Sequence, residues 1–216
     1  MFTAALDLLQ ARTGGRIGAL GLSKGAEAVL LLAVRDPRIE GVVAVSPTSV
    51  VWANVGPGTD GQSYPRRSSW TWKGEPVPFV PYDESWTPAE AEGEPRSHRT
   101  HYEQSRQTNA EAARAAAIPI EQSAADVVLI AGGDDQMWPS LDFAEELAAR
   151  RASAGRPTRI VSSSDAGHRP RFPGEGPAAR SDQFRYGGTA EADAALGAAA
   201  WPYVVAALTG EHRSGS

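Results

Sequence analysis

A serine framed by glycines stands where a short apolar run meets an apolar helical stretch. Residues 21–25 read GLSKG; they follow the run 17–20 and precede the stretch 26–34. A G-x-S-x-G pattern between a strand and a helix is typical of a nucleophile elbow, a tight turn that lifts the serine hydroxyl off the sheet. It predicts Ser23 as a nucleophile and the backbone N–H of Lys24 as a donor to an oxyanion. The alternative is a glycine-rich turn with a surface serine.

Length and composition narrow the class of protein. A chain of 216 residues suits one domain with a sizeable core. The net charge is −5 with both signs interspersed and no basic stripe, so nucleic acid is not an expected partner. The absence of cysteine excludes disulfides and a cysteine nucleophile. The four histidines lack the spacing of metal ligands, so neither a metal nor a cofactor is expected.

No signal for export or membrane insertion is found in the sequence. The first ten residues lack the basic and apolar regions of a signal peptide. No uninterrupted apolar run reaches the roughly 18 residues of a membrane span. Together with the absence of cysteine, these features predict a soluble, cytoplasmic protein without a membrane span.

Short apolar runs alternate with helical patterns along the chain. Strands are predicted at 16–20, 41–46, 127–131 and 158–161, and helices at 2–10, 26–34, 98–117, 140–154 and 189–208. Ser140 is the expected cap of the helix 140–154. This alternation predicts an α/β fold with a mostly parallel sheet flanked by helices.

The predicted domain spans residues 1–210, followed by a polar tail at 211–216. Within it, residues 47–100 are rich in Pro and Gly and hold most of the large aromatic side chains. Such a segment is too aromatic for a disordered linker. We expect an excursion that either shapes a pocket wall over the carboxyl ends of the strands or packs as an ordinary hydrophobic loop on its own domain.

A serine hydroxyl needs a base, and the base needs an acceptor that fixes its tautomer. In α/β-hydrolases these residues follow the serine in the order Asp or Glu, then His. Asp134 and Asp135 directly follow the strand 127–131; the spacing G-x-x-D favours Asp135, and Asp134 then caps the turn or faces solvent. His168 follows the strand 158–161 and is the predicted base.

Other candidates fit the pattern less well. Asp165 lies only three residues before His168 and is better suited to capping the turn. His98 and His101 precede the acid strand, which breaks the expected order, and are expected to be solvated. His212 lies in the polar tail.

The motifs together resemble the C-terminal catalytic region of acyl-CoA thioester hydrolases and bile acid-CoA:amino acid N-acyltransferases. The resemblance is spread over nearly the whole chain, in the segments 21–27 (GLSKGAE), 45–49 (VSPTS) with Trp52, 72–78 (WKGEPVP), 118–121 (IPIE), 132–138 (GGDDQMW), 166–168 (AGH), 186–188 (YGG) and 200–201 (AW).

The resemblance implies Ser23 as nucleophile, Asp135 as acid partner, His168 as base and acyl-CoA as substrate. Some family members carry cysteine at the nucleophile position and transfer the acyl group to an amino acid; serine is more similar to the hydrolytic members. The expected function is therefore hydrolysis of acyl-CoA to free acid and CoA. Amino-acid N-acyltransfer, dienelactone or carboxylester hydrolysis, and a non-catalytic fragment are the alternatives. The arginines of 169–173 face either CoA phosphates or solvent.

The elbow comes early for this fold. In α/β-hydrolases it normally follows the fifth of eight strands, so we expect only about strands five to eight, with the elbow strand at a sheet edge. The second oxyanion donor, normally from the loop after strand three, would also be missing. The expectation is that this chain is the C-terminal part of a longer enzyme whose N-terminal half is supplied upstream. Translating the DNA before Met1 tests it, because stop codons in all frames without a complementary neighbour would contradict it.

Overall fold

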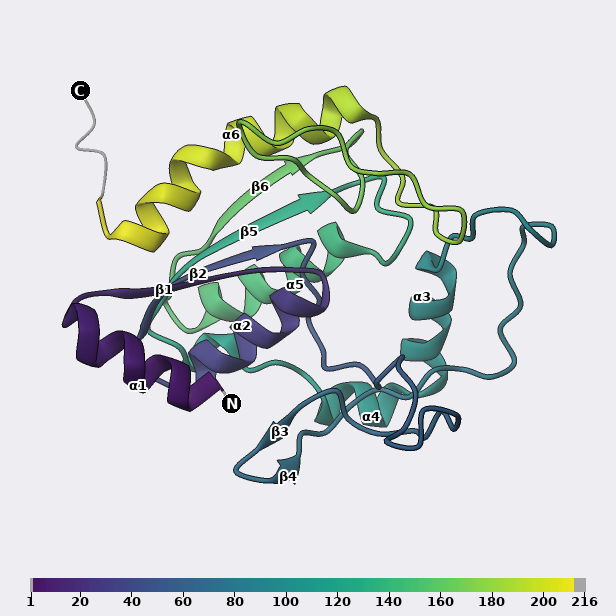
Figure 1. The fold of residues 1–216 in the computed structure, drawn as a ribbon, viewed down its shortest axis with the longest axis horizontal. Coiled ribbons are helices and arrows are strands. Elements are labelled where there is room, and N and C mark those ends of the chain that lie inside the picture. The colour runs from purple at the N-terminus through teal and green to yellow at the C-terminus, as the bar shows by residue number, and fades with distance from the viewer. Residues whose placement is uncertain (1, 212–216) are drawn as a thin grey trace.

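A sheet of four parallel strands forms the centre of the computed structural model, which describes residues 2–211 (Figure 1). The strands are β1 (Ile17–Leu22), β2 (Ile39–Val45), β5 (Asp126–Gly132) and β6 (Arg159–Ser163), and they lie in the order β1-β2-β5-β6. All three neighbouring pairs are parallel. The predicted α/β fold is confirmed, and the four predicted strands differ from the observed ones only at their ends.

Helices cover both faces of this sheet. On one face lie α2 (Lys24–Arg35) and α5 (Ser140–Ser153); on the other lies α6 (Ala190–Thr209) (Figure 1). The N-terminal α1 (Phe2–Thr13) contacts β1. The central strands β2 and β5 are buried along almost their entire length, which explains their near-continuous apolar sequence.

Two local predictions were wrong. The helix expected at 98–117 is divided into α3 (Arg99–Thr108) and α4 (Ala110–Ala115), because Asn109 leaves the helical conformation at φ −110° and ψ 45°. Ser140 does not cap α5. It is the first residue of that helix, after Pro139, and its hydroxyl donates to the Gly132 carbonyl at 3.3 Å.

The elbow strand β1 lies at the edge of the four-stranded sheet, as predicted. Leu20 and Leu22 are 43% and 40% exposed, so one apolar row of β1 is left uncovered in the described part of the chain. An edge strand also presents backbone groups that have no ladder partner.

Near its C-terminal end, the backbone of α6 lies in direct contact with two glycines of the sheet. A Cβ added at Gly41 would overlap the Ala207 carbonyl, and one added at Gly18 would lie 2.9 Å from Leu208 Cα. Glycine at these two strand positions therefore permits a contact closer than side chains allow. Among residues 2–211, α6 is the one helix that is long and apolar enough to cross a membrane by length and composition alone. In the structure one side of α6 packs on the sheet, where it buries Leu196, Ala200 and Val204.

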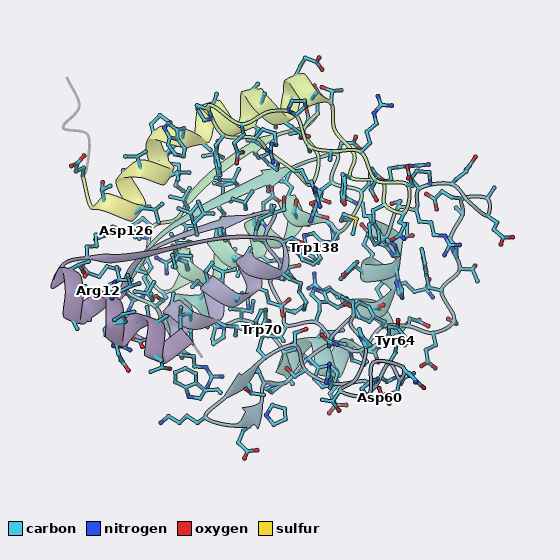
Figure 2. The ribbon with its side chains drawn as sticks, viewed as in Figure 1. Arg12, Asp60, Tyr64, Trp70, Asp126 and Trp138 are labelled. Atoms are coloured by element: carbon cyan, nitrogen blue, oxygen red, sulfur yellow. The ribbon has the colours of Figure 1, made fainter. Side chains whose placement is uncertain are left out.

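The excursion 47–100 packs beside α2 and α5 and includes a small antiparallel hairpin of β3 (Thr71–Trp72) and β4 (Glu75–Pro76) that the sequence did not predict. Trp52 is fully buried; it stacks on Tyr82 with ring centroids 5.9 Å apart and meets the edge of Tyr102 at 4.6 Å. This part of the excursion is core. Figure 2 marks Trp70, which lines a pocket of about 570 Å³ between the hairpin and the outer side of α2.

Candidate active site

The turn after β1 has the geometry expected of a nucleophile elbow. Ser23 has φ 57° and ψ −120°, a conformation that is strained for a residue with a Cβ. Its backbone N–H donates to the Val45 carbonyl at 2.9 Å, which fixes the turn at the carboxyl end of the neighbouring strand β2. The side chain is half-buried. Within residues 2–211 the Ser23 hydroxyl makes no hydrogen bond.

Lys24 begins α2 directly after Ser23. The first N–H groups of a helix have no intrahelical acceptor. In the described residues the Lys24 N–H has no acceptor of any kind, so it is free to receive one. A free N–H beside a strained serine at a helix N-terminus is a favourable place for a developing negative charge.

The two glycines of the elbow differ in what they permit. A Cβ at Gly21 would overlap the Gly25 carbonyl, because β1 and α2 come into direct backbone contact there. A Cβ at Gly25 would meet nothing within 4 Å. The backbone contact therefore requires glycine at position 21, whereas position 25 has room for a side chain.

This difference gives a stability prediction. Gly21→Ala is expected to lower the free energy of unfolding by about 1–3 kcal/mol, because strand and helix must separate to accept the methyl group. Gly25→Ala is the matched control and should change it by less than about 1 kcal/mol, since its methyl enters open space. Urea unfolding of both variants measures the difference. An equal decrease in the free energy of unfolding for both variants would contradict the prediction, because it would show that the close contact at Gly21 imposes no extra cost.

Asp135 and His168 are brought together by the loops after β5 and β6. His168 Nδ1 lies 2.8 Å from Asp135 Oδ2, and the two side chains are 4% and 0% exposed. The other carboxylate oxygen, Asp135 Oδ1, accepts the backbone N–H groups of Met137 at 2.8 Å and Trp138 at 3.2 Å. Two backbone N–H groups therefore fix Asp135 Oδ1, and Oδ2 is the oxygen that contacts the imidazole.

Asp134, the alternative acid, points elsewhere. It is exposed, and its carboxylate accepts Gln136 Nε2 at 2.7 Å and the Gly188 N–H at 2.8 Å. Asp165 is also exposed and accepts the Ser164 hydroxyl at 3.0 Å. Of the three aspartates considered from sequence, Asp135 is the one that contacts His168.

Ser46, at the carboxyl end of β2, lies between the elbow and the histidine. Its hydroxyl donates to the His168 carbonyl at 2.8 Å, and the residue before it accepts the Ser23 N–H. Ser23 and His168 therefore flank the same strand end, although no hydrogen bond joins them in the structure. Trp138 contacts both Ser46 and His168. Its indole N–H donates to the Ser46 carbonyl at 3.2 Å, and its ring packs edge-on against the His168 ring with centroids 5.4 Å apart.

The loop that carries His168 is held by residues that the sequence analysis did not assign to the site. Asp193 of α6 is buried and accepts the Gly167 N–H at 2.7 Å. Burial raises the pKa of Asp193, and this hydrogen bond opposes the shift. The Tyr186 carbonyl accepts the His168 N–H at 2.9 Å. The sequence carries no signal for this role of Asp193, because the hydrogen bond joins two distant segments of the chain.

The remaining candidates from sequence lie apart from this group. His98 and His101 are half-buried, not solvated as expected, and both pack against Trp86; the His101 ring stacks on it at 4.4 Å. Burial lowers the pKa of both histidines. His212 lies outside the described residues. The Arg169 guanidinium lies 4.1 Å from the centroid of the Tyr186 ring. Arg171 donates to the Gly176 carbonyl at 2.7 Å.

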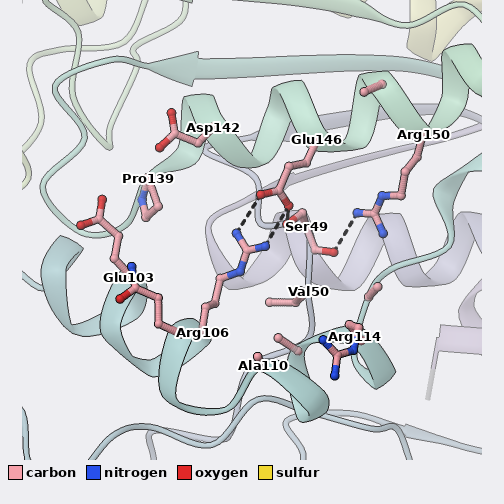
Figure 3. A pocket seen from close by; sticks show the side chains of 14 residues that line it. Ser49, Val50, Glu103, Arg106, Ala110, Arg114, Pro139, Asp142, Glu146 and Arg150 are labelled. Atoms are coloured by element: carbon pink, nitrogen blue, oxygen red, sulfur yellow. Dashed lines mark hydrogen bonds and ion pairs between the residues drawn. The ribbon is translucent and has the colours of Figure 1, made fainter.

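A pocket of about 710 Å³ lies beneath α5, between that helix and α3 and α4 (Figure 3). Two of its charged side chains pair with each other: Arg106 donates to both carboxylate oxygens of Glu146, at 2.9 and 3.1 Å. Neither this pocket nor the one beside Trp70 has Ser23, Asp135 or His168 in its wall. The excursion therefore forms one wall of the pocket beside Trp70, and that pocket does not include Ser23. Within residues 2–211 no three His, Asp or Glu side chains are grouped to hold a metal ion.

Comparison with known proteins places this geometry in context. A family model described as BAAT / Acyl-CoA thioester hydrolase C terminal matches residues 2–210. This match confirms the resemblance inferred from the sequence motifs, and it spans the elbow, Asp135 and His168. A search among curated proteins finds no match.

Proposed function

Because the chain belongs to the BAAT / acyl-CoA thioester hydrolase C-terminal family, we propose that it is a serine hydrolase that cleaves acyl-CoA thioesters to a free acid and CoA. The observation that carries the proposal is the buried hydrogen bond of 2.8 Å between His168 Nδ1 and Asp135 Oδ2. Such a bond fixes the imidazole with its proton on Nδ1 and leaves Nε2 to act as a base. The strained elbow at the adjacent strand end supports Ser23 as the nucleophile.

In the proposed reaction His168 Nε2 removes the proton of the Ser23 hydroxyl as Oγ attacks the thioester carbonyl carbon. The negative charge that develops on the carbonyl oxygen is stabilised by the Lys24 N–H. When the C–S bond breaks, His168 returns the proton to the CoA sulfur and the acyl group stays on Ser23. A water molecule, deprotonated by His168, then attacks the ester carbonyl carbon. The acyl C–Oγ bond breaks, His168 returns the proton to Ser23 Oγ, and the free acid is released.

The family description also includes an acyltransferase, so transfer of the acyl group to an amino acid is the second candidate. Both reactions share the acyl-enzyme and differ in the acceptor that attacks it. Serine at position 23 favours water, because the family's transferring members noted above carry cysteine there. A cytoplasmic location stays a prediction from composition.

The acceptor and the leaving group are tested in one set of assays. Released CoA is measured with a thiol reagent, for which the chain gives no background because it has no cysteine. We expect CoA release from acyl-CoA, slower turnover of p-nitrophenyl esters, and no amide product when glycine or taurine is added. Formation of an amide would show that an amine, and not water, is the acyl acceptor. Turnover of esters without turnover of acyl-CoA would show that the protein is a carboxylester hydrolase. No turnover of either class would overturn the proposal.

A further inference from the structure

A buried carboxylate, Glu27, lies one turn along α2 from Ser23. Its side chain is 0% exposed. It accepts Lys24 Nζ at 3.0 Å on each oxygen, the Trp70 indole N–H at 2.6 Å and the Trp52 N–H at 3.4 Å. Burial raises the pKa of Glu27 and lowers that of Lys24, and the ion pair between them opposes both shifts.

Such a pair is poorly explained by stability alone. Replacing a buried ion pair by apolar residues of similar volume is often neutral or stabilising, because buried charges lose their hydration. In this pair Glu27 is fully buried and the Lys24 side chain is 29% exposed. A buried charge network is better accounted for by the geometry that it fixes. Here the network joins the elbow, through Lys24, to the excursion, through Trp52 and Trp70.

The Lys24 ammonium is fully occupied. Its three N–H groups have three acceptors: the two oxygens of Glu27 and the Trp52 carbonyl at 3.2 Å. The side chain therefore has no donor left for a substrate. Its backbone N–H is the group that faces the reaction in the mechanism above. The Lys24 side chain is therefore held by hydrogen bonds, whereas its backbone N–H is available to an acceptor.

We propose that Glu27 is a positioning residue for the acyl-transfer step. By holding the Lys24 side chain, it fixes the direction of the Lys24 N–H and of the strained turn at Ser23. Strained conformations persist only where the surrounding structure determines them, and the Glu27 network supplies that constraint from the excursion side. This inference rests on the proposed function, because it assigns Glu27 to the same nucleophile and oxyanion donor.

The rate at which a fluorophosphonate probe labels Ser23 tests the proposal without assuming the acyl substrate. In Glu27→Gln the carboxylate charge is lost while the side-chain shape is kept. We expect the second-order labelling rate constant to fall about 10- to 100-fold, as for a modest misplacement of a catalytic group. On acyl-CoA, kcat should fall by a similar factor with KM little changed. Glu146→Gln is the matched control; it breaks an ion pair on α5 that does not contact the elbow and should label at the wild-type rate.

The double variant Lys24→Met/Glu27→Leu separates positioning from stability, and it remains informative if Glu27→Gln fails to fold. Removing both charges should restore the melting temperature, whereas labelling should stay at least about tenfold slow because the tether is gone. Recovery of both would make Glu27 merely structural and overturn the inference, as would a wild-type rate in Glu27→Gln. A wild-type chain that does not label at Ser23 would overturn the proposed function and the inference with it.

Discussion

Ser23→Ala is expected to lower acyl-CoA turnover by about 10⁴- to 10⁶-fold, because no acyl-enzyme can form without the hydroxyl. The neighbouring Ser46 hydroxyl does not offer a substitute, since it donates to the His168 carbonyl. The fold should be unchanged, because alanine keeps the Cβ and the backbone bond to Val45. Mass spectrometry of the intact protein during the first turnover measures the acyl adduct, and thermal unfolding checks the fold.

A matched control for this variant is Ser153→Ala, an exposed serine at the end of α5 that should retain full activity. The acyl adduct should appear on the wild type and on this control. An adduct of the same mass on Ser23→Ala would move the nucleophile to another residue and remove Ser23 from the mechanism.

Asp135→Asn is expected to lower kcat by about 10⁴-fold while leaving KM within a few-fold of the wild type. The asparagine oxygen can still accept the N–H groups of Met137 and Trp138. Its amide N–H₂ then faces His168 Nδ1 and favours the tautomer with the proton on Nε2, which cannot accept the serine proton. Steady-state kinetics with acyl-CoA measures the loss.

The adjacent aspartate provides the control for this prediction. Asp134→Asn removes a charge one residue away but keeps an oxygen for the Gly188 N–H, so we expect a loss of less than about tenfold. If Asp134→Asn were the inactive variant and Asp135→Asn the active one, the buried hydrogen bond to His168 would not be the one that supports the reaction.

The elements that the sequence predicted well are those in which one local signal dominates. Strands covered on both faces must be continuously apolar, so β2 and β5 were predictable from runs such as 127–131. Their parallel arrangement follows from the helices between them. The spacing of the loop also favoured Asp135 over Asp134 as the partner of His168, because neighbouring side chains leave the backbone in different directions; its role in a reaction stays a prediction. The structure gives the reason: the Asp135 side chain turns inward and Asp134 binds the segment 186–188.

The features that the sequence did not predict depend on contacts between distant segments. Nothing local to Asp193 shows that it will hold Gly167, 26 residues earlier. The break at Asn109 and the hairpin of β3 and β4 occur where propensity is weak and packing of the excursion decides the backbone. His98 and His101 look like surface residues of a polar segment, and they become half-buried because rings from elsewhere in the chain, such as Trp86, pack against them.

The glycine contacts under α6 have a consequence for how the molecule can open. At Gly18 and Gly41 no strand side chain lies between α6 and the sheet, so the C-terminal part of the helix is in direct backbone contact with the sheet. The loop that carries His168 is joined to the same helix, because the Gly167 N–H donates to Asp193. On the opposite face the turn at Ser23 is tied to the excursion by the hydrogen bonds of Lys24 and Trp70 to Glu27. Any displacement of α6 would therefore also move the segment that carries the base, whereas the nucleophile is held by a separate set of contacts.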